Sequence, residues 1–346
     1  MFLKNVWYIA AWSEEVPVTG IFKRKLLGED VVFFRQTDGN IVGMADYCPH
    51  RYLPLSLGRH EGDNIRCMYH GLVFDGKGKC VEAPFSDTPP KKVCARVYPT
   101  VEQDRFVWIW MGDDSKADPD LIPSLKVMND KSWHYIPRHL VYKCHVQLLM
   151  DNLLDASHLA FVHASTIGGG DYHAKQTPEL ETFDWVVRVT KKFENVPLPP
   201  FVKKVARFEG NTDRWQIFDW HIDGYQLILN SGQAPTGTGA LEGNYVDEAF
   251  HFHSVQTLTP ESENSTHYFF MFAHSFTDEQ DRIAKEIDAQ FAIVLEEDKV
   301  ILEAQQAKLE EYPNHKMAGI KSDLAVSKAR MLLEERMQKE ARKSAD

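Results

Sequence analysis

The chain has 346 residues, of which 43% are hydrophobic and 26% are charged, so it is long enough for about two globular domains, each with its own core. Its formal net charge of -11, without a basic stripe, argues against a nucleic-acid partner. Five cysteines are an odd and sparse set, which disfavours a disulfide framework and suits a reducing compartment.

The first residues, MFLKNVWYIAAWSEEV, contain no run approaching the ~20 apolar residues of a membrane span. They also lack an extended apolar signal region with a small-residue cleavage site. We therefore expect a cytoplasmic protein without a membrane segment.

Short β-rich runs separated by turn signals such as TDGN and DGKGK fill the chain from Asn5 to about Trp110. The runs are VWYIAA, DVVFFRQ, IVGMADY and RFVWIWM. This half is predicted to be all-β. Residues 112–124 are polar, contain proline and have no periodicity, which predicts a linker. We expect one domain over residues 1–115 and a second over residues 116–346.

The second half contains further strand-like runs and closes with two predicted helices. The strands are WVVRVTKKFE, WQIFDWHIDGYQLILN, AFHFHSVQTL and STHYFFMFAHSF. The first helix is expected to begin near Thr277, whose hydroxyl can form a capping box with Gln280, and to end at about Tyr312. The second, from about Ser322 to Lys343, is highly charged.

Two cysteine–histidine pairs stand in the first half at metal-ligand spacing. Cys48-x-His50 is followed, after sixteen intervening residues, by Cys67-x-x-His70. Each pair can bind one ion from a tight loop. A mononuclear zinc site would only stabilise the fold, whereas a two-iron cluster with thiolates on one iron and imidazoles on the other would transfer single electrons.

The pattern C-x-H-R followed by C-x-x-H-G resembles the Rieske [2Fe–2S] motif of bacterial aromatic-ring-hydroxylating oxygenases. Respiratory Rieske proteins add a disulfide between their two loops, and this sequence has no matching cysteine pair. The oxygenase branch therefore fits better. The resemblance implies that the four residues bind a Rieske cluster.

The stretch DNLLDASHLAFVH, residues 151–163, places polar groups among residues that belong in a core. Burial penalises such groups unless something holds them, and a metal ion is one candidate. On a regular helix His158 and His163 would lie about 140° apart, so they converge only if the helix is distorted or ends between them. Asp155 is expected to share the face of His158 and to accept its second N–H.

A third ligand is predicted from the periodicity of the first C-terminal helix. Its apolar stripe runs through Ile283, Ile287, Phe291, Val294 and Leu295, then position 298, then Leu302. Position 298 is an aspartate, and a carboxylate on a buried face needs a cation. The neighbouring Glu296 and Glu297 are expected to point elsewhere. His158, His163 and Asp298 thus form a two-histidine, one-carboxylate set of the type that binds non-haem Fe(II).

Nearly the whole chain resembles the terminal oxygenase components of the vanillate O-demethylase, dicamba O-demethylase and toluenesulfonate methyl-monooxygenase group. The resemblance rests on KNVWYIAAW, the two cysteine–histidine loops, VWIWMGD, DNLLDASHLAFVH, DRWQI and EEDKVILEA. It implies an α+β fold: an N-terminal all-β Rieske domain, then a helix-grip-like catalytic domain with an antiparallel sheet packed by helices.

The family also implies roles for individual residues. His158, His163 and Asp298 would ligate the catalytic iron, with Asn152 close to it. Asp155 would bridge electrons to His158 from the Rieske histidine of an adjacent subunit, which implies a homotrimer. Electrons would come from NAD(P)H through a separate reductase or ferredoxin component.

The implied reaction is monooxygenation of a methoxy or methyl group of a small anionic aromatic compound. Candidate substrate contacts are Asn230, His251, His253 and Gln256 on two predicted strands; alternation puts the two histidines on one face, which could equally be a solvated one. Ring hydroxylation and a stand-alone Rieske electron carrier remain alternatives. A carrier needs only the first 110 residues and gives no reason for Asp298 on an apolar stripe.

Overall fold

The computed structural model describes residues 2–125, 130, 133–168, 170–244, 246, 248–274, 280–314 and 316–343. The chain forms two compact units, Met1–Leu125 with Thr259–Glu263, and Lys126–Leu258 with Asn264–Asp346. Each unit is described by itself below. Among the described residues, no helix combines the length and the hydropathy that crossing a bilayer requires.

The first unit is built from small antiparallel sheets. One holds β1 (Trp7–Trp12), β11 (Phe106–Trp110) and β10 (Thr100–Gln103); another holds β2 (Phe22–Leu26), β3 (Glu29–Arg35), β4 (Ile41–Ala45) and β9 (Val97–Tyr98); a third holds β5 (Arg59–Glu61), β6 (Asn64–Arg66), β7 (Val73–Asp75) and β8 (Cys80–Glu82). The four strand-like runs predicted for this half are confirmed. The predicted linker, residues 112–124, contains two 3-10 turns, which begin after Asp113 and Asp118 as N-caps.

The core of this unit lies beneath the two cysteine–histidine loops. Cys48 and Cys67 belong to a buried apolar cluster together with Phe34, Met44 and Phe74. Burying these side chains removes apolar surface from water, which stabilises the strands and at the same time holds both thiols in a dry environment. The loops therefore stand on a rigid base.

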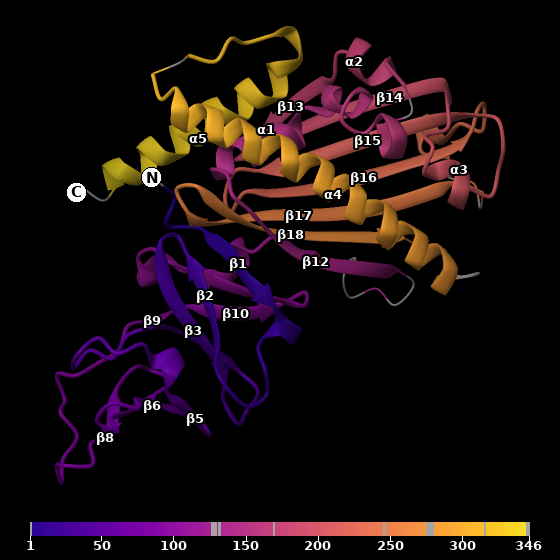
Figure 1. The fold of residues 1–346 in the computed structure, drawn as a ribbon. Coiled ribbons are helices and arrows are strands. Elements are labelled where there is room, and N and C mark those ends of the chain that lie inside the picture. The colour runs from indigo at the N-terminus through magenta and orange to yellow at the C-terminus, as the bar shows by residue number, and fades with distance from the viewer. Residues whose placement is uncertain are drawn as a thin grey trace. The chain divides into compact units, whose positions relative to one another are not determined.

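The second unit is a seven-stranded antiparallel sheet with helices on one face (Figure 1). Its order is β12 (His134–Tyr142), β18 (Ser265–His274), β17 (Phe250–Ser262), β16 (Gln226–Pro235), β15 (Asn211–His221), β14 (Val186–Pro197) and β13 (Glu179–Phe183). The helices are α1 (Val146–Leu154), α2 (Tyr172–Lys175), α3 (Val202–Val205), α4 (Gln280–Glu311) and α5 (Leu324–Lys343). The tip of the β17–β18 hairpin is grouped with the first unit.

Helix α4 lies across the sheet because its apolar stripe faces the strands (Figure 1). The Phe291 ring contacts Phe270 and Phe272 with ring centroids 5.1 and 4.6 Å apart, and the Tyr142 hydroxyl donates to the Leu295 carbonyl over 2.5 Å. The predicted end of this helix is confirmed to within one residue, whereas its predicted start near Thr277 lies outside the described residues. The stripe places Asp298, only 7% exposed, on the buried side.

Candidate metal centres

The two cysteine–histidine loops share one backbone design. In each, the cysteine N–H donates to the carbonyl five residues later, and its own carbonyl accepts from the N–H four residues later. The pairs are Cys48–Leu53 and Tyr52–Cys48 at 2.8 Å, Cys67–Leu72 at 2.8 Å and Gly71–Cys67 at 3.0 Å. The fourth residue is left-handed in both loops, with φ of 57° at Tyr52 and 72° at Gly71. Tyr52 thus adopts a conformation that Gly71 adopts without strain.

These loops bring together a mixed sulfur and nitrogen donor set. Cys48 and Cys67 are buried, and the His50 and His70 rings lie 4.6 Å apart between centroids. Burial raises the pKa of the Cys48 thiol to about 11, with Cys67 adding to the rise and the backbone N–H groups of His50 and Arg51 opposing it. Those N–H groups would stabilise a thiolate. Two inner thiolates and two outer imidazoles fit a Rieske [2Fe–2S] cluster, which supplies one-electron transfer when bound.

The second constellation begins where α1 ends at Leu154, so the two histidines of residues 151–163 are not on one helix. Asp155 caps a 3-10 helix over Ala156–Ala160, and its Oδ1 accepts from the Ser157 N–H over 2.8 Å. The expectation that its carboxylate orients His158 is wrong. His158 Nδ1 instead contacts the backbone carbonyl of Asp155, because the carboxylate is used as the cap.

His163 is fully buried and is held from two sides by neighbouring residues of α4. Its Nδ1 lies 2.7 Å from Glu297 Oε2, and the Thr166 hydroxyl donates to the same oxygen over 3.2 Å. Its Nε2 lies 3.1 Å from Asp298 Oδ1 without hydrogen-bond geometry. The expectation that Glu297 points elsewhere is therefore wrong: its longer side chain reaches back to the imidazole from the edge of the buried face.

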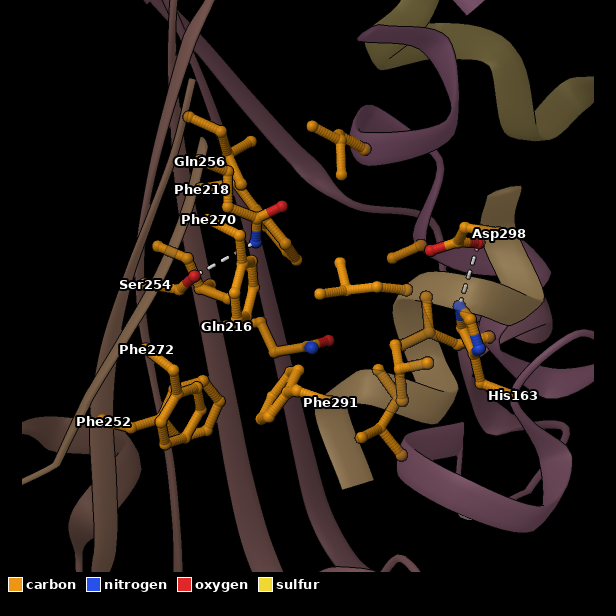
Figure 2. A pocket seen from close by; sticks show the side chains of 18 of the residues that line it. His163, Gln216, Phe218, Phe252, Ser254, Gln256, Phe270, Phe272, Phe291 and Asp298 are labelled. Atoms are coloured by element: carbon orange, nitrogen blue, oxygen red, sulfur yellow. Dashed lines mark hydrogen bonds and ion pairs between the residues drawn. The ribbon is translucent and has the colours of Figure 1, made fainter. Parts of the chain in front are cut away.

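The three predicted ligands meet at one point. One nitrogen each of His158 and His163 and one oxygen of Asp298 lie within 4.8 Å of one another, and Figure 2 shows Asp298 facing His163. His158 Nε2 is 3.7 Å from Asp298 Oδ1, and the Asn152 amide donates to that oxygen over 3.0 Å. Asn152 thereby orients the Asp298 carboxylate.

The protonation of this cluster favours a cation between its members. Burial lowers the pKa of His158, and Asp298 offsets this only in part, so His158 presents a neutral ring. Burial also lowers the pKa of His163, but Asp298 and Glu297 outweigh it and the net shift is upward. His163 Nε2 is also a buried atom that lacks a hydrogen-bond partner. Two imidazoles and a carboxylate fit Fe(II), which would take the place of the proton.

A cavity of about 110 Å³ lies between these three residues and the sheet (Figure 2). Most of its wall is aromatic or aliphatic, including Phe201, Phe218, Phe250, Phe252, Phe270, Phe272 and Phe291. Its polar wall residues other than the metal cluster and Asn152 are Arg214, Gln216, Gln233, Ser254, Gln256 and Tyr268. Such a cavity fits a flat apolar molecule with a small number of polar substituents.

Gln256, one of the four residues predicted to contact substrate, lines this cavity. Asn230, His251 and His253 do not line it. Successive residues of a strand point to opposite faces of the sheet, and each of these three lies one residue away from a residue that faces the cavity. His251 Nε2 instead lies 3.1 Å from Asn230 Oδ1, and the ring packs near Trp133. The expectation that these three residues bind substrate is corrected accordingly.

Sequence reasoning missed Arg214, Gln216, Gln233 and Glu297. Alternation along DRWQIFDW could have found the first two, because Arg214, Gln216 and Phe218 share one face. Gln233 lies opposite Arg214 in the β15–β16 register, which the sequence does not reveal. The role of Glu297 could not be predicted without the position of His163, which lies 134 residues away in the sequence.

Residues 6–99 match the Rieske [2Fe-2S] domain family, and residues 142–339 match the vanillate O-demethylase oxygenase C-terminal domain family. The chain belongs to the Rieske non-haem iron oxygenases. It is 40% identical to the toluene-4-sulfonate monooxygenase system iron-sulfur subunit TsaM1 of Comamonas testosteroni over 96% of both chains. It is 33% identical to the oxygenase component of dicamba O-demethylase of Stenotrophomonas maltophilia over 88% of both chains.

The solved structures agree with this membership. The crystal structure of dicamba monooxygenase bound to 3,6-dichlorosalicylic acid matches with a TM-score of 0.88 and 30% identity, over 98% of this chain and 99% of that one. The structure of that enzyme with non-haem iron and dicamba matches with a TM-score of 0.82. The predicted fold class is confirmed. The chain is the oxygenase component of a multicomponent Rieske monooxygenase, with a [2Fe–2S] cluster and a mononuclear iron, and it works with O₂ and a reductase or ferredoxin component.

Proposed function

We propose that this chain oxidises a methyl or methoxy group of a small anionic aromatic compound. The observation that carries the proposal is the cavity: its walls are mainly phenylalanine rings, and one side is formed by His158, His163 and Asp298. Relatives named toluene-4-sulfonate monooxygenase and dicamba O-demethylase act on a methyl-bearing and a methoxy-bearing arene, which supports the same class here.

We assign the ligands as the sequence suggested. Cys48, His50, Cys67 and His70 bind the cluster, and His158, His163 and Asp298 bind the iron. The bound iron supplies the site at which O₂ is reduced. With two electrons and two protons, one oxygen atom enters a C–H bond and the other leaves as water.

The residues of the chain decide which C–H bond is presented to the iron. The aromatic walls hold the arene by dispersion and by excluding water, while Asn152 keeps the Asp298 carboxylate in place. Hydroxylation of a methoxy carbon gives a hemiacetal, which collapses to a phenol and formaldehyde. Hydroxylation of a ring methyl group gives a benzylic alcohol.

The proposal includes a homotrimer in which a cluster serves the iron of an adjacent subunit. Exposed apolar side chains lie near both centres: Tyr52, Met68 and Tyr69 on the cluster loops, Phe161 between the two histidines in the sequence, and Ile293, Val300 and Ile301 on α4 around Glu297. Patches of this kind on a protein surface indicate interaction sites. Asp155, which directly precedes the 3-10 helix of His158, is proposed to bridge the two centres.

We also propose a functional boundary near residue 115 and a cytoplasmic location. The location follows from the NAD(P)H that the reductase consumes. It is also consistent with the five cysteines, none of which forms a disulfide.

Product analysis with a purified reductase tests the proposed reaction. The panel comprises methoxybenzoates, methylbenzoates and 4-toluenesulfonate, and the products are identified by mass spectrometry with ¹⁸O₂. We expect formaldehyde with a phenol from a methoxy substrate, or an ¹⁸O-labelled benzylic alcohol from a methyl substrate. Hydroxylation of the ring with the methyl or methoxy group intact would contradict the proposal, as would electron transfer without product.

A further inference from the structure

Arg214 is a buried cation in the wall of the catalytic cavity. The residue is only 4% exposed, and it lies on the face of β15 that points into the cavity. Burying a charge is unfavourable unless an opposite charge accompanies it, and an arginine side chain keeps its charge. The nature of its neighbours therefore decides what the site is built to bind.

All of the hydrogen-bond acceptors around the Arg214 guanidinium are uncharged. Nη1 lies 2.9 Å from His173 Nε2 and 3.0 Å from the Tyr172 hydroxyl oxygen, and both terminal nitrogens reach backbone carbonyls at 3.4–3.5 Å. Its Nε is buried and has no hydrogen-bond partner among the described residues. Across the part of the chain that the structure describes, no carboxylate oxygen forms an ion pair with Arg214.

Other arginines of the same unit are paired with acids. Arg138, Arg188, Arg330 and Arg336 contact Asp288, Asp219, Asp151 and Asp223. Each of these four arginines is more exposed than Arg214. The arginines that are paired with an acid are therefore the less buried ones. Arg214, the most buried of these five arginines, thus has no carboxylate partner among the residues that the structure describes.

A second buried cation, Lys191, lies near Arg214, and the single Asp155 carboxylate offsets only part of the charge of this pair. Lys191 is also buried, and its ammonium donates to the His173 carbonyl over 2.9 Å. Burial, together with the charges of Arg214 and Lys191, lowers the pKa of His173 to about 2. His173 is therefore neutral and accepts a hydrogen bond without carrying charge. An anion in the adjoining cavity would compensate this local excess.

Two amides complete a polar corner beside the guanidinium. Gln233 lies directly across from Arg214 in the β15–β16 register, and Gln216 lies two residues further along the same face. Both side chains are buried, and each carries an amide Nε2 with two N–H donors. Figure 2 shows the amide of Gln216 directed into the cavity. Amide N–H groups and a guanidinium are the donors that oxyanions use.

We propose that Arg214 binds the anionic substituent of the aromatic substrate, and that Gln216 and Gln233 donate to its remaining oxygens. The inference rests on the proposed function and names the feature that selects the substrate: a sulfonate or carboxylate on the ring. The arene lies among the phenylalanine rings of the same cavity. Arg214 is thus a specificity-determining residue for compounds that carry both an oxyanion and an oxidisable methyl or methoxy group.

Isothermal titration of the purified, metal-loaded protein without reductase tests this assignment. The ligands are 4-toluenesulfonate, 4-methylbenzoate and the uncharged methyl 4-tolyl sulfone, and the variants are Arg214→Gln, Arg214→Lys and the control Arg188→Gln. Arg188 lies on the other face of the sheet, in an ion pair with Asp219. The native protein should bind at least one anion more tightly than the sulfone.

In Arg214→Gln the affinity for that anion should fall about 10- to 100-fold, since a hydrogen-bonded charge is removed. The affinity for the sulfone should stay nearly unchanged, and Arg188→Gln should behave like the native protein. The anion with the larger loss identifies the substituent that the site selects. Arg214→Lys retains the charge but not the bidentate fork, so it should retain a smaller preference for the anion.

Equal affinities of the native protein for anions and sulfone would overturn the assignment, as would an unchanged preference in Arg214→Gln. If Arg214→Gln does not fold, equal losses for anion and sulfone in Arg214→Lys would overturn it. Binding needs neither O₂ nor electrons, so the two proposals fail separately. Arg214-dependent anion binding without methyl or methoxy oxidation would contradict only the proposed function.

Discussion

A single imidazole, His163, is held by two consecutive carboxylates of α4. Consecutive helix residues are 100° apart, so Asp298 faces the metal cluster while Glu297 stands at its edge. The extra methylene of Glu297 lets it reach Nδ1, which fixes the proton on that nitrogen and leaves Nε2 as the ligand atom. Glu297, which is not itself a proposed ligand, therefore sets the orientation of the His163 ring.

Replacing Glu297 by glutamine tests this orienting role. Glu297→Gln retains the length of the side chain but removes the charge that stabilises the Nδ1 proton, so we expect iron affinity about 10- to 100-fold weaker. The measurement is iron content after dialysis against a graded series of chelator concentrations, with the cluster absorbance as internal control. Glu296→Gln, one residue away, serves as the matched variant. Equal iron retention in both variants would contradict the role.

Burial of neutral histidines makes the protein sensitive to acid. Burial, with the nearby His253, lowers the pKa of His251 to about 4, whereas an unfolded histidine titrates near 6.5. The unfolded chain therefore binds more protons below pH 6.5, and stability is lost as the pH falls from about 6.5 toward 4.

The neutral substitution His251→Asn should flatten this acid limb. Between pH 6 and pH 4.5 the dependence of unfolding free energy on pH should be shallower by at most about 1.4 kcal/mol per pH unit, the effect of one proton. Urea unfolding across that range measures it. Above pH 7 the unfolding free energies of the native protein and the variant should change with pH in parallel. At that pH a histidine at position 251 binds no proton in either the folded or the unfolded state. A parallel profile at every pH would refute the assignment.

At the scale of elements, the site depends on a break in helical structure after Leu154. A 3-10 helix over Ala156–Ala160 carries His158, and one turn of π-helix over Ala164–Gly168 follows His163. The Gly168 N–H donates to the His163 carbonyl over 2.9 Å, so the wide turn closes directly on the ligand residue. The irregular backbone lets two histidines five residues apart converge.

Gly168 permits this closure because a side chain there has no room. A Cβ atom at Gly168 would lie 2.3 Å from the Leu159 carbonyl oxygen and 2.9 Å from that of His163. We expect Gly168→Ala to displace the turn, lower the melting temperature and weaken iron binding. Gly319→Ala is the matched control, since among the described residues only a side-chain atom of Asp323, 3.9 Å away, lies within 4 Å of such a Cβ atom. Full iron occupancy in Gly168→Ala, with an unchanged melting temperature, would disprove this account.

At the scale of the whole molecule, the proposed trimer pairs the cluster of one chain with the iron of a neighbouring chain. A variant without iron and a variant without cluster should then rescue each other. We expect coexpressed Asp298→Ala and His70→Ala subunits, purified through two different affinity tags, to regain turnover that each homotrimer lacks. Every mixed trimer contains at least one neighbour pair with an intact cluster beside an intact iron site.

The control for this experiment is a mixture of the two homotrimers prepared separately. It should stay inactive, because subunits do not exchange without dissociation. Asp155→Asn introduced into the His70→Ala subunit should remove the rescue while iron and cluster contents stay the same. Absence of rescue in mixed trimers would place both centres of a working pair in one chain.

Local patterns in the sequence determined much of this protein. The two cysteine–histidine loops, the strand-like runs and the apolar stripe that puts Asp298 on a buried face all depend on spacing alone. Spacing also predicted a helix that is distorted or ends between His158 and His163, and the 3-10 helix that carries His158 ends at Ala160. These features depend on residues that are close together in the sequence, so they can be predicted without knowing how distant segments pack.

Tertiary structure alone decided which polar side chains face the cavity. Arg214 and Gln233 meet through the β15–β16 register, and Glu297 meets His163 across 134 residues. Asn230, His251 and His253 lie on the opposite face of the sheet, because a step of one residue along a strand moves the side chain to the other face. Period-2 alternation gives two faces but not which of them a helix will cover, and that depends on where α4 packs.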